Sequence, residues 1–266
     1  MVAYAAPLRG RGADRAAVTR GHVEIIHLRR LGVASNVWVY RPDLPDSATL
    51  PVVYFLHGLP GQPQSLFKAG LAHVMDNYLA HGGTPVVIAA PDGNSPRHAD
   101  TEWGDASDGS DELETFILTK VFAAVEQGHP RDAAHRAIAG FSMGGYGSMN
   151  IALQHPERFG QIVSIAGYFH LDDPSDMFAT AGSRRANDPE LHVKRAQGHH
   201  ILLLDGRDDR LALTRHESQR FKGLLHRAGV PATLKIPPGT HSWDLVIDQL
   251  PAVLRFLAGG WGSYPQ

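Results

Sequence analysis

The segment Gly140-Phe141-Ser142-Met143-Gly144 places a serine in the pattern G-x-S-x-G. In a nucleophile elbow, a sharp turn between a strand and a helix exposes such a serine, and small residues two positions before and after it prevent clashes. The residues R-A-I-A before this segment predict a buried strand, and G-Y-G-S-M-N-I-A-L after it predicts a helix. We therefore expect Ser142 to be a nucleophile. The alternative is a serine that only caps the helix.

A serine hydroxyl is a weak nucleophile near neutral pH, so a base must remove its proton during attack. In hydrolases with this elbow the chain order is serine, then an acid, then a histidine after the last strand. Of the 16 histidines, only His241 lies between the last predicted strand and the last predicted helix, and we expect it to be the base. Four others lie on predicted helices or at strand ends and are interpreted as structural: His57, His199, His200 and His226.

Three carboxylates compete to be the acid that orients His241, because Asp205, Asp208 and Asp209 all lie at or just after the predicted strand I-L-L-L-D. Asp205 is still on that strand and is interpreted as holding the turn. The acid in such loops commonly stands three residues after the glycine, which favours Asp209 over Asp208. Asp208 remains the alternative.

The tetrahedral intermediate of acyl transfer carries an oxyanion that needs hydrogen-bond donors. In elbow-type hydrolases one donor is the backbone N–H after the nucleophile, and the other lies in the loop after the third strand. These positions predict the N–H groups of Met143 and Leu59 as the oxyanion hole. Pro60, the next residue in that loop, has no N–H to donate.

A sheet must bring these residues together, and short apolar runs that alternate with helical patterns predict the α/β class. Strands are predicted at 22–29, 36–41, 52–56, 85–90, 136–141, 162–167, 201–205 and 232–236. The first two leave no room for a helix between them and are predicted to be antiparallel. The later runs show little polar alternation, as in parallel strands that are covered on both faces. We expect an α/β-hydrolase fold with a central, mostly parallel eight-stranded sheet and helices on both faces.

Five helical patterns accompany these strands, at 66–80, 111–126, 143–155, 214–228 and 243–257. The polar, turn-rich segment 168–197 predicts a small cap between the sixth and seventh strands. No repeat or linker divides the chain, so residues 1–266 are predicted to form a single domain with frayed ends at 1–19 and 259–266.

Composition excludes several classes of function. The formal net charge is −2, which predicts no nucleic-acid partner, and no apolar run approaches the length of a membrane span. The chain has no cysteine, which excludes disulfides and thiolate sites. No signal peptide is visible, so the protein is expected in the cytoplasm as written, or outside the cell if a leader was removed. The oligomeric state stays open.

Metal and cofactor patterns are missing from the sequence. No H-x-x-x-H or H-E-x-x-H spacing falls on a predicted helix, so no metal and no cofactor are expected. Residues 100–114 hold seven carboxylates, but they lack the ordered ligands and central glycine of a calcium loop. A solvated loop that leads into a helix is the favoured interpretation.

Five sequence blocks carry a resemblance to a known family. They are Y-F-L-H-G-L-P-G at 54–61, A-A-P-D-G at 89–93, E-W-G-D and E-T-F within 102–116, A-G-F-S-M-G-G-Y-G-S-M at 139–149, and G-T-H-S-W at 239–243. Together they resemble the putative-esterase group of α/β-hydrolases, which includes esterase D, S-formylglutathione hydrolases and mycolyltransferases.

The resemblance implies a serine carboxylesterase that acts on a small acyl ester through a Ser-His-Asp triad. Departures from individual members favour a general carboxylesterase: the cysteine usual in S-formylglutathione hydrolases is absent, their D-Q-G is replaced by D-G-R-D-D, and Pro60 stands where a basic residue is expected. The alternatives are a thioesterase of the S-formylglutathione hydrolase type, an acyltransferase of the mycolyltransferase type, and a binding protein without catalysis.

Candidates for the substrate pocket come from the predicted cap and from the start of the last helix. Phe169, Met177 and Phe178 lie in the cap, where they line an acyl or alcohol pocket or belong to the core of the cap. Trp243, two residues after His241, is the fourth candidate.

Overall fold

One sheet of eight strands organises the computed structural model, which describes residues 20–262. The strands are β1 (Gly21–Arg30), β2 (Val33–Pro42), β3 (Val52–Leu56), β4 (Val87–Pro91), β5 (Arg136–Phe141), β6 (Gln161–Ile165), β7 (His200–Leu204) and β8 (Thr233–Lys235). Their spatial order is β1-β2-β4-β3-β5-β6-β7-β8. The pairs β1–β2 and β2–β4 are antiparallel and all other pairs are parallel. Every predicted strand is present, and the predicted α/β-hydrolase fold is confirmed.

The helices differ from the prediction mainly by being broken. They are α1 (Ser65–Lys68), α2 (Leu71–Ala80), α3 (Leu113–Phe116), α4 (Phe122–Glu126), α5 (Met143–Gln154), α6 (Ala181–Ala186), α7 (Glu217–Arg227) and α8 (Trp243–Ala258). The predicted helix 66–80 is interrupted by Gly70, whose φ of 119° is incompatible with a continuous helix. The predicted helix 111–126 consists of α3 and α4 joined by a π-helical turn, Ile117–Val121.

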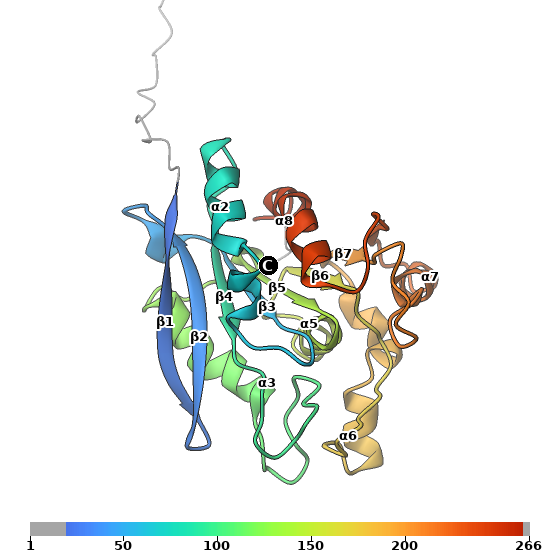
Figure 1. Ribbon diagram of the computed structural model, residues 1–266. Helices are drawn as coiled ribbons and strands as arrows, with labels where there is room; N and C mark the ends of the chain where they lie inside the picture. The colour runs from blue at the N-terminus through green and yellow to red at the C-terminus, as the bar shows by residue number, and fades with distance from the viewer. Residues whose placement is uncertain (1–19, 263–266) are drawn as a thin grey trace, which may run out of the picture.

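Helices cover both faces of the sheet and create two hydrophobic cores. Buried residues of α2 and α8 pack in one core, and those of α3, α4, α5 and α7 pack in the other. Side chains along β5 alternate between them, because Ile138 belongs to the second core and Ala137 and Ala139 belong to the first. Figure 1 shows the β1–β2 hairpin at one side of the molecule and α7 with the cap helix α6 at the other.

The predicted cap is present between β6 and β7 and contains α6 and the short 3₁₀ helix η4 (Pro189–Ala196). The expected fraying from residue 259 is wrong for 259–262, because Gly260 is buried and the N–H of Gly262 donates to the carbonyl of Ala134 at 3.1 Å. Residues 1–19 and 263–266 lie outside the described part of the chain.

Candidate active site

The carboxyl end of β5 presents Ser142 on a strained turn. Its φ of 58° and ψ of −120° lie outside the usual regions for a side-chain-bearing residue. The turn is held by the N–H of Ser142, which donates to the carbonyl of Ile165 at 2.9 Å. A Cβ on Gly140 would lie 2.0 Å from the carbonyl oxygen of Gly144, and a Cβ on Gly144 would lie 2.1 Å from that of Leu56. Both flanking positions therefore require glycine, as the G-x-S-x-G pattern predicted.

His241 lies between β8 and α8 and contacts Ser142 directly. Its Nε2 is 2.9 Å from the Oγ of Ser142, and its Nδ1 is 2.9 Å from Oδ2 of Asp209. The ring of Phe141 lies 4.7 Å from the imidazole, centroid to centroid. Because Asp209 accepts at Nδ1, the neutral ring carries its proton there and leaves Nε2 free to accept the hydroxyl proton of Ser142.

The loop of residues 206–216, hereafter the acid loop, gives its two neighbouring aspartates different partners. Asp209 is buried, and its Oδ1 accepts the N–H of Leu211 at 2.9 Å while its Oδ2 faces His241. Asp208 is exposed, and its Oδ2 accepts the N–H of Gly239 at 3.1 Å. The structure thus brings Asp209, and not Asp208, to the imidazole.

Asp205 is the third carboxylate considered from the sequence, and it lies at the base of the acid loop. Its Oδ1 accepts the hydroxyl of Ser218 at 2.6 Å, and its Oδ2 is buried without a hydrogen-bond partner. Burial is the main cause that raises the pKa of Asp205 to about 6, and the nearby Asp209 contributes to this rise. Its contact with Ser218 ties the end of β7 to α7, which agrees with the interpretation that it holds the turn.

The predicted oxyanion donors, Leu59 and Met143, lie in two segments next to Ser142. Met143 is the first residue of α5, where a helical N–H has no partner within the helix. The loop that contains Leu59 runs beside Ser142, since a Cβ on Gly58 would lie 2.9 Å from the Cβ of the serine. Among the hydrogen bonds of the described residues, none uses the N–H of Leu59 or of Met143. Both groups are therefore available to an oxyanion.

The sequence did not predict that His57 and Trp103 support the loop that contains Leu59. The Nδ1 of His57 is 2.9 Å from the carbonyl of Gly58, and its Nε2 accepts the N–H of Gly93 at 3.1 Å. The indole N–H of Trp103 donates to the carbonyl of His57 at 3.1 Å. Burial lowers the pKa of His57, which favours the neutral ring that this pattern requires. His57 is structural, as expected, and its contacts fix the loop that presents Leu59.

The chain matches the model of a known family. A model of the family described as "Putative esterase" matches residues 29–257. The chain belongs to this family. The protein is accordingly a serine hydrolase that acts on carboxylic ester bonds.

Solved structures of hydrolases resemble this esterase over nearly its whole length. A ferulic acid esterase aligns with a TM-score of 0.77 and 23% identity, covering 90% of this chain and 97% of that one. A fluorophosphonate-binding serine hydrolase of Staphylococcus aureus aligns with a TM-score of 0.74 and 19% identity, covering 90% of this chain and 98% of that one. An S-formylglutathione hydrolase from Agrobacterium tumefaciens aligns with a TM-score of 0.74 and 21% identity, covering 92% of this chain and 97% of that one. At these identities the likeness establishes the shared fold.

The four pocket candidates of the esterase lie mostly in packed interiors. Phe169 is fully buried and stacks on Phe221 of α7, with ring centroids 4.1 Å apart. Met177 and Phe178 are buried together in a small cluster with Ala106. Phe169 therefore belongs to the main core beside α7, and Met177 and Phe178 pack the cap against the loop that precedes α3. Trp243 is half-buried, and its ring packs 5.3 Å from that of Phe141, beside the base.

A cavity lies beside Asp209. It has a volume of about 150 Å³ and is lined by Asp205, Gly206, Arg207, Asp209, Thr214, Arg215, His216, Gln219 and Ile236. Neither Ser142 nor His241 borders it, so this space is separate from the position where an acyl group would be attacked.

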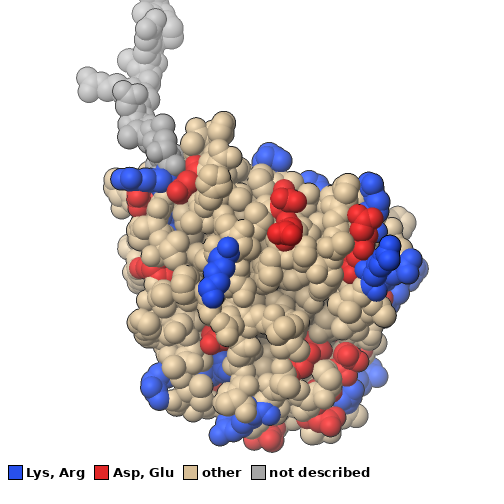
Figure 2. Space-filling view, viewed as in Figure 1, with Lys and Arg blue, Asp and Glu red and all other residues tan. Residues whose placement is uncertain are grey.

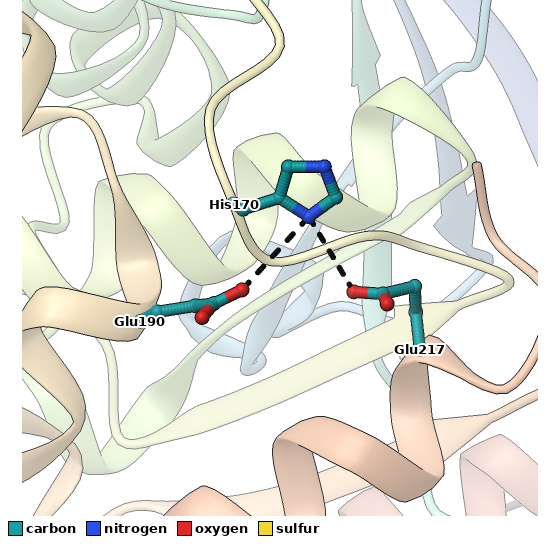
Figure 3. A group of neighbouring side chains, drawn as sticks. All are labelled: His170, Glu190 and Glu217. Carbon is teal, nitrogen blue, oxygen red and sulfur yellow. Dashed lines mark ion pairs between the residues drawn. The ribbon is translucent and has the colours of Figure 1, made fainter.

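Within residues 20–262, one group of side chains has the composition of a metal site. The Nδ1 of His170 lies 3.8 Å from Oε1 of Glu190 and 3.7 Å from Oε2 of Glu217, as Figure 3 shows. However, Arg220 donates to both carboxylates, with its Nη2 2.7 Å from Oε2 of Glu217. The group is therefore an ion-pair network that joins the cap to α7. Its members come from three separate segments, which is why no spacing in the sequence predicted it.

The described part of the chain contains no helix that is both long and apolar enough to cross a membrane. On the face seen in Figure 2, acidic and basic side chains are interspersed and neither sign dominates.

Proposed function

We propose that the esterase hydrolyses small acyl esters with Ser142 as nucleophile, His241 as general base and Asp209 as the orienting acid. The observation that carries this proposal is the continuous chain of contacts from Oγ through the imidazole to the carboxylate, with both links at 2.9 Å. The buried, hydrogen-bonded Asp209 supports it further, because an ionised carboxylate there stabilises the imidazolium that forms on attack.

In the acylation step, the Oγ of Ser142 attacks the ester carbonyl while Nε2 of His241 takes its proton. The carbonyl oxygen becomes an oxyanion, to which the N–H groups of Leu59 and Met143 donate. His241 then returns the proton to the alcohol oxygen as the C–O bond breaks, and an acyl-serine remains. Deacylation repeats these steps with water as the nucleophile.

Small aryl or short-chain esters are the substrates that the cap favours. The cap is short, and its side chains Phe169, Met177 and Phe178 are packed in interiors, which favours a shallow acyl site over a deep tunnel. A ferulic acid esterase among the structural neighbours adds esters of aromatic acids as a second class to test. No nucleic-acid partner, metal or cofactor is proposed.

A fluorophosphonate probe tests the nucleophile. We expect it to label the protein, and peptide mass spectrometry to find the adduct on Ser142. Labelling of another serine, or none at all in folded protein, contradicts the proposal and favours a binding protein.

A panel of substrates tests the specificity. We expect rapid hydrolysis of p-nitrophenyl acetate and methyl ferulate, and slower hydrolysis of long acyl esters. Preference for S-formylglutathione indicates the thioesterase alternative. Product esters formed with added alcohols in preference to hydrolysis indicate the acyltransferase.

A further inference from the structure

A buried hydroxyl contacts both the acid and the base of the triad. Thr214, at the end of the acid loop, is 1% exposed. Its Oγ1 lies 2.9 Å from Oδ2 of Asp209 and 3.4 Å from Nδ1 of His241. The same Oδ2 faces the Nδ1 of His241. The three polar atoms therefore form a closed triangle behind the imidazole.

The proton on this hydroxyl has one good acceptor. The carbonyl of Leu211 is 3.5 Å from Oγ1, at the limit of a hydrogen bond, whereas Oδ2 of Asp209 is at 2.9 Å and is an anionic acceptor. Thr214 thus donates to Asp209, and a lone pair of its oxygen is left toward the Nδ1–H of His241.

We propose that Thr214 is a positioning residue of the triad, which fixes the plane of the Asp209 carboxylate and through it the orientation of His241. The N–H of Leu211 holds one carboxylate oxygen and the hydroxyl of Thr214 holds the other. Without the hydroxyl, Oδ2 keeps its contact with the imidazole but loses its second partner, so the plane of the carboxylate, and with it the orientation of the imidazole toward Ser142, is no longer fixed. This inference rests on the proposed function, since it assumes that the triad is catalytic.

The hydroxyl of Thr214 and the imidazole of His241 both contact Oδ2 of the negatively charged Asp209. When the hydroxyl is removed, Oδ2 has one donor fewer and attracts the imidazolium more strongly, so the protonated base persists to higher pH. Other charged or titratable groups line the cavity beside Thr214: Asp205, Arg207, Arg215 and His216. Because a substitution at Thr214 leaves them all in place, a change in pH profile reports on the triad.

Thr214→Val tests the proposal, because valine replaces the hydroxyl with a methyl group at similar volume. We expect kcat on p-nitrophenyl acetate to fall about 10- to 100-fold, the usual scale for a buried group left unpaired. KM should change by less than about twofold. The midpoint of the acid limb of kcat/KM should move upward by about half a pH unit. Thr214→Ser, which retains a hydroxyl, should restore both kcat and the midpoint.

Ser218→Ala is the matched control. It removes another buried hydroxyl that donates to a buried carboxylate, at 2.6 Å from Asp205, but that carboxylate does not contact His241. It should lower stability and leave the pH midpoint unchanged. All variants are checked for folding by circular dichroism and for active-site number by fluorophosphonate titration.

Two results would overturn the inference: a Thr214→Val enzyme with kcat within twofold of wild type, or a loss of kcat with an unmoved midpoint that serine does not restore. Failure of the triad itself is recognised separately, because Ser142→Ala would then remain active.

Discussion

The nucleophile elbow, residues 140–145, and the acid loop hold their functional side chains by different means. In the elbow, backbone packs on backbone: a Cβ at Gly140 or Gly144 would lie within about 2 Å of a carbonyl oxygen. In the acid loop, main-chain hydrogen bonds hold the backbone, but side-chain hydrogen bonds hold the carboxylates, as Asp208 accepts from Gly239 and Asp209 faces His241. The serine is thus fixed by close main-chain packing, and Asp209 is fixed by hydrogen bonds from its own loop and by its contact with His241.

This difference predicts different responses to substitution. The elbow has no room for a side chain at Gly140 or Gly144, because the neighbouring atoms belong to the main chain and cannot move aside as a side chain can. The acid loop accepts changes of side chain wherever the hydrogen bonds to the imidazole survive. The following substitutions test the comparison, beginning with the largest expected effect.

Ser142→Ala should reduce kcat by about 10⁴- to 10⁶-fold without unfolding the protein, because it removes only the nucleophilic oxygen. The measurement is hydrolysis of p-nitrophenyl acetate by protein with an unchanged circular dichroism spectrum. A folded variant that keeps more than a few per cent of activity would show that the elbow does not carry the nucleophile.

Asp209→Asn should lower kcat by up to about 10⁴-fold, because the amide donates to Nδ1 and stabilises the wrong imidazole tautomer. Asp208→Asn is the matched control. Its amide oxygen still accepts from Gly239, and the lost charge is exposed, so kcat should stay within about threefold of wild type. If the ranking of the two variants is reversed, Asp208 is the acid.

Gly144→Ala should destabilise the fold by about 3 kcal/mol or more, since the new Cβ meets the carbonyl oxygen of Leu56 at 2.1 Å. Gly223→Ala, in the middle of α7, meets its nearest atom at 3.5 Å and should stabilise by about 0.5–1 kcal/mol. Urea unfolding measures both. Equal effects would mean that the elbow is no more constrained than an ordinary helix.

Asp205→Asn should stabilise the protein above neutral pH. Since the pKa of Asp205 is raised to about 6 from 3.8, its ionisation costs the folded state stability as the pH rises through that interval. The variant avoids this cost, so its free energy of unfolding should exceed that of wild type by about 1–3 kcal/mol at pH 8 and by little at pH 4. A gain that is the same at both pH values would contradict the raised pKa.

The sequence by itself determined the elements and the local geometry of the elbow. Apolar runs and glycines act on neighbouring residues, so the eight strands, the G-x-S-x-G turn and the place of His241 after the last strand could all be predicted. The break at Gly70 could not, because glycine permits a left-handed turn without requiring one.

Tertiary structure alone decided which side chains meet. Ser142 and His241 are 99 residues apart and Asp209 and His241 are 32 apart, so their contacts depend on how the strands pack in the sheet. Thr214 reads as the start of a helix in the sequence, yet its hydroxyl contacts the acid. The sequence is equally compatible with Phe169 and Phe178 in a substrate pocket or in a hydrophobic core, and the tertiary packing buries both side chains. Local sequence encodes backbone geometry, whereas the direction and burial of a loop side chain are set by atoms from distant segments.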